Sequence, residues 1–219
     1  MNSHIIINNP FSYHPIFLCL RILKIKLKMK KVYFLAAVLF SVLMVGCGPT
    51  AEEKEKEENE MSTQKRFTIE AILEEYNDCS ANAESRNDCK NFTARAICEY
   101  YGIDDLKKGG EYVEYHDIFD FVTTDASWKN LGMATVQETL DNAQQMANDG
   151  FAVVAIDTED KHKLAIVIIE GEQVTSGSWG LNAPTCAAFF PASGPKPFIH
   201  KTLNYAFSSP EGIQLWVKK

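Results

Sequence analysis

The chain has 219 residues, of which 22 are Lys or Arg and 29 are Asp or Glu, so its formal net charge at pH 7 is −7. Apolar residues make up 46% of the chain and charged residues 23%, a composition that excludes wholesale disorder. The acidic balance argues against a nucleic-acid-binding protein, because such a protein needs a basic face to neutralise phosphates. Six cysteines are too few for a small disulfide scaffold, but they raise the question of the compartment.

The charge is divided unevenly along the chain. Residues 1–46 hold six basic residues and no acidic one, whereas residues 47–219 hold 16 basic and 29 acidic residues, a net charge of −13. This contrast indicates two parts that join near Cys47, and we expect the first part to lie outside the folded domain.

The first part has the pattern of a secretory signal peptide. Its last three basic residues are Lys28, Lys30 and Lys31. They lead into the apolar run 32–45, and a basic region before a short apolar stretch is typical of an export signal. The run has 14 residues, whereas a bilayer-spanning helix needs about 20, so a transmembrane anchor is the less favoured alternative. We predict a signal peptide over residues 1–46, in which Met29 is a more natural start than Met1.

Residues 43–47 read Leu-Met-Val-Gly-Cys and resemble a bacterial lipobox, with Met44 where that motif usually has Leu. The resemblance implies that Cys47 becomes the lipidated first residue of the mature protein and holds it at a membrane. We therefore expect an exported lipoprotein of the outer membrane or cell envelope, on its periplasmic or surface side. The charged run Ala51–Glu60 cannot bury apolar surface, so residues 47–65 are predicted to be a solvated tether, with an exposed helix as the alternative for part of it.

The remaining residues, 66–219, amount to one domain. Its first half shows helical signals, among them Asn87 and Asp88 as N-cap candidates and a capping box at Thr135. The predicted helices cover Thr68–Tyr76, Cys89–Tyr101 with Gly102 as the stop, His116–Phe121, and a segment that opens at Thr135–Glu138 and ends at Gly150.

The second half shows strand signals. Phe151–Ile156 and Leu164–Ile169 are apolar runs on either side of a polar turn and predict a β-hairpin with both faces covered. Gln173–Ser176 is predicted as a third strand and Gln214–Val217 as a closing strand, whereas the four prolines between positions 184 and 197 predict loops. Helices followed by an antiparallel sheet define an α+β fold class.

Cys89 is the first candidate for chemistry because it is predicted at the start of a helix. The positive end of a helix dipole stabilises a thiolate, and a cysteine there, followed by a His on a strand, is the arrangement of cysteine hydrolases. The alternative is a disulfide, since cysteines of exported domains are commonly paired. The four cysteines of the domain are Cys79, Cys89, Cys98 and Cys186, and they permit three pairings that the sequence leaves open.

The segment Asp88-Cys89-Lys90-Asn91-Phe92-Thr93 resembles the nucleophile helix of NlpC/P60-related bacterial amidases. The resemblance continues in order over nearly all of Arg66–Lys219. It includes Gly102, His116-Asp117-Ile118, Trp128, the helix ending at Gly150, Val153-Val154-Ala155, Leu164–Ile169, Ser176-Gly177-Ser178-Trp179 and Leu203–Phe207. It implies a papain-like fold with N-terminal helices on an antiparallel sheet. It also implies cleavage of amide bonds in the peptide stems of peptidoglycan by a Cys nucleophile, a His base and a third polar residue that orients the His.

The base is where the sequence departs from the family pattern. The family usually has Gly-His directly before a small apolar strand, whereas this chain has Lys161-His162-Lys163. Aligning the strand on Ala165 puts Lys163 at the His position, and an offset of one residue aims His162 away from Cys89. A bulge or another hairpin register would turn His162 back, and a solvated turn histidine is the remaining alternative.

Further site residues follow from the same resemblance. Ser176 is the candidate for the third catalytic member, with Ser178 beside it and ordinary turn chemistry as the alternative. His116, Trp128 and Trp179 are candidates for substrate binding, against a surface histidine and core or cleft-wall tryptophans. No metal and no cofactor is predicted, because the histidines lack a carboxylate at ligand spacing and the sequence has no CxxC pair and no phosphate-binding loop.

These observations predict an exported, lipid-anchored cysteine hydrolase of peptidoglycan stem peptides, with Cys89 as nucleophile and His162 as base. The alternative is a catalytically inactive amidase-like domain that binds cell-wall peptide or a partner protein, which Lys163 at the His position favours. A third, weaker possibility is a surface lipoprotein without a cleft. A disulfide at Cys89 would exclude the hydrolase, because the nucleophile would be lost.

Overall fold

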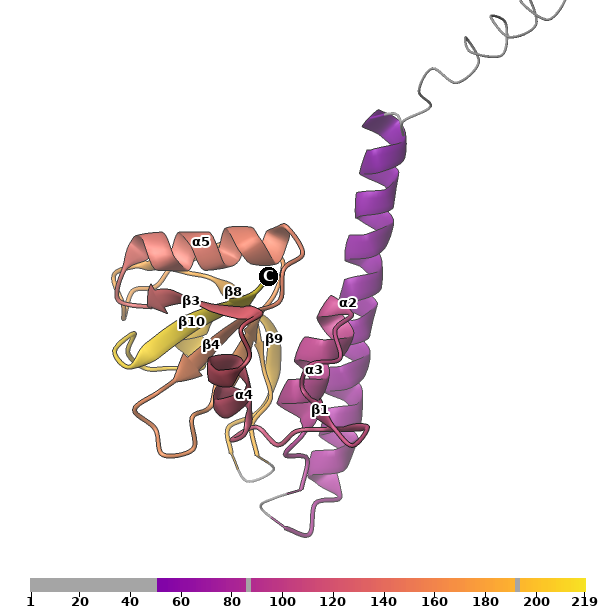
Figure 1. Ribbon diagram of the computed structural model, residues 1–219, viewed down its shortest axis with the longest axis vertical. Helices are drawn as coiled ribbons and strands as arrows, with labels where there is room; N and C mark the ends of the chain where they lie inside the picture. The colour runs from indigo at the N-terminus through magenta and orange to yellow at the C-terminus, as the bar shows by residue number, and fades with distance from the viewer. Residues whose placement is uncertain (1–50, 86–87, 192–193) are drawn as a thin grey trace, which may run out of the picture. The chain divides into compact units, whose positions relative to one another are not determined.

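The computed structural model describes residues 51–85, 88–191 and 194–219 (Figure 1). The predicted signal peptide and the lipidation candidate Cys47 lie outside these residues. The described part contains four α-helices and a six-stranded antiparallel sheet, which confirms the predicted α+β class. The helices are α2 (Ala51–Ala81), α3 (Phe92–Tyr101), α4 (Ile118–Thr124) and α5 (Gln137–Asn148).

The six-stranded sheet has the strand order β3-β10-β4-β5-β8-β9, and every neighbouring pair is antiparallel. Two short ribbons, β1-β2 and β6-β7, lie outside it. The strands of the main sheet are β3 (Trp128–Met133), β4 (Val153–Asp157), β5 (Ala165–Ile168), β8 (Thr185–Ala188), β9 (Phe198–Thr202) and β10 (Ile213–Lys218). The ribbons are β1 (Lys107–Lys108) with β2 (Glu111–Tyr112) and β6 (Val174–Thr175) with β7 (Asn182–Ala183), and a 3-10 turn covers Leu203–Tyr205.

The predicted hairpin is confirmed, since β4 and β5 pair with Val153 opposite Ile168. The predicted closing strand exists as β10, but it lies inside the sheet between β3 and β4. The proline-containing segment was expected to form loops, and this is wrong for β8 and β9. Pro184 and Pro197 stand directly before these two strands, a place where a missing backbone N–H breaks no ladder bond.

Both faces of the sheet are covered, which explains the continuous apolar runs of β4 and β5. Val154 and Ile156 pack in one core with residues of α2, α3 and α4, whereas Val153 and Ala155 pack in a second core with α5. In Figure 1, α5 lies on one side of the strands and α4 on another. The sheet therefore separates two hydrophobic cores. The core to which a buried residue belongs shows on which face of the sheet that residue lies.

Helix α2 is much longer than the predicted Thr68–Tyr76. It begins at Ala51 and includes the charged run that was expected to be a tether, so the exposed-helix alternative is confirmed there. All ten side chains of 51–60 are exposed. The run still forms a helix because Glu and Lys have high helix propensity, and Glu52 and Glu53 complement the positive end of the dipole.

Helix α3 packs on α2 through apolar side chains, with the ring of Tyr76 against that of Phe92, and through one arginine. Arg95 donates to the two carboxylate oxygens of Glu75 on α2 at 2.5 and 3.0 Å, and to Glu99 on α3 at 2.7 Å. The hydrogen bond from Arg95 holds the pKa of the Glu75 carboxyl below its ordinary value. This contact joins the same two helices that the cysteines described below connect.

Two predicted helix starts are displaced. The helix expected from His116 begins at Ile118, and the capping box at Thr135 does not form because Val136 occupies the N-cap position of α5. The backbone N–H of Val136 donates to the carbonyl of Met133, so Thr135 belongs to the turn that follows β3. The end of α5 is close to the prediction, since Gly150 follows it with φ 87°.

Candidate functional site

Cys89 forms a disulfide with Cys79, with Cα atoms 6.0 Å apart. The prediction of a free nucleophile at Cys89 is therefore wrong in this structure, because a sulfur in a disulfide carries no thiolate to attack a carbonyl. The bond joins the last turn of α2 to the turn that precedes α3. Since Cys98 and Cys186 stay free, the domain forms this one bond and none of the three complete pairings that the sequence left open.

The position of Cys89 differs from the predicted helix start as well. Helix α3 begins at Phe92, its N-cap is Asn91 without a side-chain bond, and Cys89 lies in the preceding turn with φ 61°. Asp88, a predicted N-cap, instead accepts hydrogen bonds from the backbone N–H groups of Glu84 and Ser85 at 2.9 Å. The other predicted N-cap, Asn87, lies outside the described residues. The predicted stop is confirmed, since Gly102 is left-handed and ends α3.

The two remaining cysteines of the domain are free and buried. Burial raises the pKa of the Cys98 thiol and that of the Cys186 thiol, because a thiolate loses its hydration there. They lie in different cores, Cys98 with the α2–α3 side and Cys186 with the α5 side. Neither is therefore a substitute for Cys89 as a nucleophile.

His162, the predicted base, and Lys163, which aligns with the family's His position, lie in the turn before β5. The backbone N–H of His162 donates to Asp160 at 2.8 Å, and its ring centroid lies 6.3 Å from that of Tyr115. Lys163 has φ 50°, donates from Nζ to the carbonyl of Thr158 at 2.9 Å, and places the ammonium 4.7 Å from the Phe119 ring centroid. Lys163 thus closes its own turn, which gives this ammonium a structural role.

Tyr115 connects His116 and His162 to the turn that contains Cys89. The sequence did not predict this role for Tyr115. Its backbone N–H donates to the carbonyl of Lys90 at 2.8 Å, and its ring lies 5.3 Å from that of His116 as well as near that of His162. His116 is exposed and lies 3.5 Å from Glu114, which also forms an ion pair with Lys90. We call Lys90, Tyr115, His116 and His162 the Tyr115 surface. Its only sequence signal is the adjacency of Tyr115 to His116.

The predicted third catalytic member, Ser176, is not part of this group. It is 4% exposed and lies in the turn between β6 and β7, where its hydroxyl is 3.1 Å from that of Ser178 and accepts from the Trp179 backbone N–H. Trp179 packs in the core on the α5 side, whereas Cys89 belongs to the core on the other face of the sheet. Assigning Ser176 and Trp179 to the Cys89 site was wrong, because β6 pairs with β7 and does not extend the main sheet.

Trp128 is also unsuited to its predicted role. It lies on the edge strand β3, is 5% exposed and packs into the core on the α2–α3 side. A ring this buried cannot present its face to a bound peptide. The core alternative is therefore confirmed for Trp128, and among the predicted substrate-binding residues only His116 stays beside the Cys89 turn.

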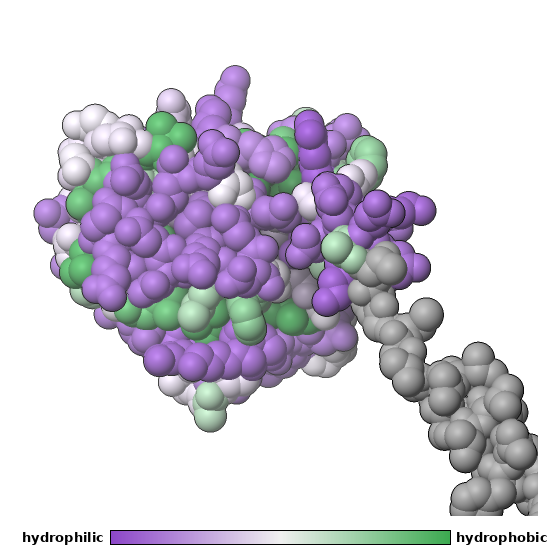
Figure 2. Space-filling view, turned by 90° about the horizontal axis from the view of Figure 1, so that it is seen from above, coloured by the Kyte–Doolittle hydropathy of each residue, from purple (hydrophilic) through white to green (hydrophobic). Residues whose placement is uncertain are grey.

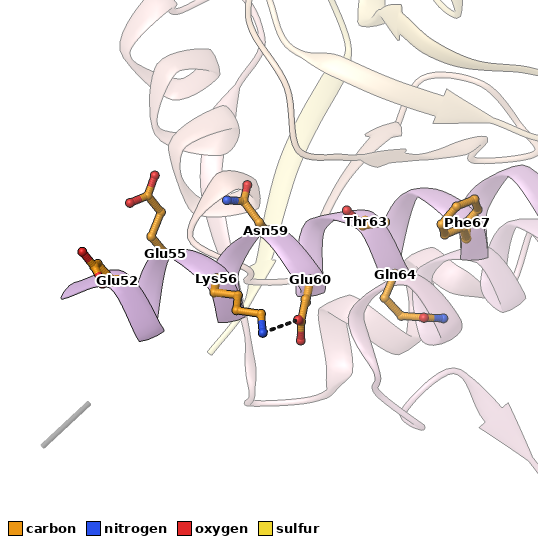
Figure 3. Close-up of a pocket in the computed structure, with 8 residues that line it drawn as sticks. All are labelled: Glu52, Glu55, Lys56, Asn59, Glu60, Thr63, Gln64 and Phe67. Carbon is orange, nitrogen blue, oxygen red and sulfur yellow. Dashed lines mark ion pairs between the residues drawn. The ribbon is translucent and has the colours of Figure 1, made fainter. Parts of the chain in front are cut away.

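Two hollows of the described surface lie away from the Tyr115 surface. Figure 3 shows one of them, whose eight labelled residues, from Glu52 to Phe67, all come from α2, so it is an open helix face. A second is lined by residues of α2, the end of α5 and Glu170. Neither includes Cys89, Tyr115 or His162. The described residues contain no group of three His, Cys, Asp or Glu placed to hold a metal ion.

The face of the molecule seen in Figure 2 is covered mainly by hydrophilic side chains, with hydrophobic residues in small separate groups. Every helix among the described residues is too short or too polar to cross a membrane. No family model matches the chain, and no curated protein matches it.

Proposed function

We propose that this chain is an exported, lipid-anchored domain with the papain-like fold of the NlpC/P60 amidases, which binds cell-wall peptide without cleaving it. The observation that carries this proposal is the Cys79–Cys89 disulfide, since it removes the thiolate on which amide cleavage depends. The use of Lys163 to close its own turn supports it, because the position aligned with the family's base carries an engaged ammonium. The order of motifs along the chain supports the amidase-like fold.

The Tyr115 surface is the binding site in this proposal. It has two imidazole rings around a phenol, and together with Lys90 it comes from three segments that are far apart in the chain. Tyrosine gives a large contact area at a low cost in conformational entropy and is enriched among residues that dominate binding. A peptide that carries amide and carboxylate groups can accept hydrogen bonds from the phenol and the imidazoles.

The test is a sedimentation assay of the purified protein with insoluble peptidoglycan under non-reducing conditions, with soluble products separated as muropeptides. We expect the protein to pellet with the sacculi and to release no muropeptides, and Cys89→Ala to release none either. Release by the wild type that is lost in Cys89→Ala would instead establish the hydrolase. A protein that stays in the supernatant would contradict binding.

Tyr115→Ala is expected to weaken this binding by roughly tenfold, as truncation of an aromatic anchor costs more than about 1 kcal/mol. Tyr205→Ala is the matched control, because Tyr205 is 64% exposed and belongs to the β9 side of the molecule. Titration of both variants against a fixed amount of sacculi measures the difference. Equal affinity of the two variants would remove Tyr115 from the binding site.

The lipid anchor is tested separately. Cys47→Ala is expected to abolish incorporation of labelled palmitate and to move the protein from the membrane fraction to the soluble fraction, because the thiol is the proposed acylation point. Ser41→Ala, a substitution within the apolar run of the proposed signal peptide, is the control and should leave the label in place. Labelling of Cys47→Ala at the wild-type level would refute the lipobox assignment.

A further inference from the structure

We propose that the Cys79–Cys89 disulfide is a redox switch that sets where α3 begins, at Phe92 when oxidised and at Cys89 when reduced. This inference does not depend on what the domain binds. It arises from a mismatch, because the sequence pattern favours a helix from Cys89 whereas the structure delays it by three residues. The delay coincides with the crosslink and with the unusual backbone of the crosslinked residue.

The backbone of Cys89 has a conformation that its surroundings must impose. Among residues 88–91, Cys89 alone has a positive φ, 61°, in the left-handed region that L-residues with a side chain rarely adopt. Such a conformation persists only when its surroundings impose it. Here the bond to Cys79 holds the Cys89 side chain toward the end of α2, and the carbonyl of the next residue, Lys90, is held by Tyr115.

The residues just before α3 are already close to a helical arrangement. The first bond of the helical ladder, from the Arg95 N–H to the Asn91 carbonyl, is already present at 3.0 Å. Asn91 itself is in the right-handed region with φ −99°. A change of Cys89 to negative φ would therefore let Cys89, Lys90 and Asn91 form a first turn. The Lys90 carbonyl can keep its bond to Tyr115, since a carbonyl oxygen has two lone pairs.

Asp88 would supply the N-cap of the longer helix. Aspartate is among the best N-cap residues, and Asp88 would occupy the N-cap position of a helix that begins at Cys89. In the oxidised form its carboxylate is engaged by the backbone N–H groups of Glu84 and Ser85. Reduction would let it exchange these partners for the N–H groups of the new first turn. The longer helix would thus gain a cap that the present α3 lacks.

The redox step is a thiol–disulfide exchange with a dithiol, either a protein or a small molecule. The dithiol gives two electrons and two protons to the disulfide, forms its own disulfide, and leaves Cys79 and Cys89 as thiols. Exchange with the other cysteines of the described domain is disfavoured, since Cys98 and Cys186 are buried with raised thiol pKa values. Reduction therefore frees two thiols, the half-buried Cys79 and the buried Cys89, and Cys89 then lies at the positive end of α3 and beside the Tyr115 surface.

The test compares oxidised wild-type protein, wild type treated with dithiothreitol, and Cys79→Ser, by NMR chemical shifts of the backbone. We expect the Cα shifts of Cys89, Lys90 and Asn91 to move to helical values in the two forms without the crosslink, while those of α5 stay unchanged. Shifts that stay non-helical in a folded protein would overturn the switch. Loss of the folded state in both forms would overturn it as well, because a switch needs a folded reduced state.

A second readout is the rate of Cys89 alkylation by iodoacetamide in Cys79→Ser between pH 5 and 10. A thiol at a helix N-terminus is expected to have a lower pKa than an ordinary cysteine, because the helix dipole stabilises the thiolate. Cys89→Ser is the matched control, because it leaves Cys79 free near the opposite end of a helix. At pH 7 Cys89 should therefore be alkylated faster than Cys79, with the midpoint of its rate profile at lower pH. Equal titration midpoints would contradict the inference, whereas failure to bind peptidoglycan would leave these readouts untouched.

Discussion

Cys79→Ser and Cys89→Ser are each expected to lower the free energy of unfolding by about 3 kcal/mol, the value for a crosslink that closes a loop of roughly this length. The two cysteines are 10 positions apart, and the bond ties the end of α2 to the turn before α3. Its removal gives the unfolded chain more conformations, and it removes a covalent link between two helices that otherwise meet through their shared apolar core and Arg95. Urea denaturation without reductant measures the difference in the free energy of unfolding between the wild type and each variant.

The double variant Cys79→Ser/Cys89→Ser is the control for this experiment. It should be no less stable than either single variant, since all three lose the same single bond. Dithiothreitol should destabilise the wild type by a similar amount and leave the double variant unchanged. A wild type that is equally stable with and without the reductant would show that the crosslink contributes nothing to stability.

The fold class was predictable because its signals are local and periodic. The helical spacing of Ile69, Ile72, Leu73 and Tyr76 predicts a buried stripe, and all four are buried except Leu73, which is partly buried. The β4–β5 hairpin follows from two apolar runs with one turn between them. The order of the strands was not predictable from such patterns. The position of β10 between β3 and β4 is decided by long-range pairing, which leaves no periodic trace in the strand itself.

The candidate site was predicted only in part, for a related reason. The motif around Cys89 correctly indicated a helix, but that helix begins at Phe92 instead of Cys89. The partner of Cys89 lies on another helix, and four cysteines do not reveal their pairing. Ser176 and Trp179 follow Cys89 in the expected order along the chain, yet Trp179 packs in the core on the other face of the sheet and Ser176 lies in the turn between β6 and β7. Tyr115 was missed because a single tyrosine has no spacing pattern, and its role depends on contacts with Lys90 and His162.

Gln144, in the core on the α5 side, is another residue whose role depends on long-range contacts that the sequence does not reveal. The sequence places it on the predicted helix as a polar residue without further distinction, whereas the structure makes it 4% exposed and fully hydrogen-bonded. Its side-chain oxygen accepts from the backbone N–H of Thr185 at 2.7 Å, and its side-chain nitrogen donates to the carbonyl of Ile169 at 2.9 Å. One amide therefore joins α5 to the residues that flank β5 and β8.

Gln144→Ala is expected to lower the free energy of unfolding by about 3 kcal/mol, because two buried backbone groups each lose a partner at a cost of about 1–3 kcal/mol. The Ile169 N–H also donates to the Thr185 carbonyl, and this backbone bond would stay in the variant. The Thr185 N–H and the Ile169 carbonyl would become unpaired. Thermal and urea unfolding, with an unchanged dependence on urea concentration, would measure the loss as a change in stability alone.

Gln145→Ala is the matched control, since the next residue on α5 is exposed and its substitution should change stability by less than about 0.5 kcal/mol. Gln144→Glu separates the two bonds, because a carboxylate can still accept from Thr185 but cannot donate to Ile169. That variant should lose stability as the pH rises and the buried carboxyl ionises beside a carbonyl oxygen. Equal stability of Gln144→Ala and Gln145→Ala would mean that water replaces the amide at both backbone groups, and the amide would then not be what joins α5 to the sheet.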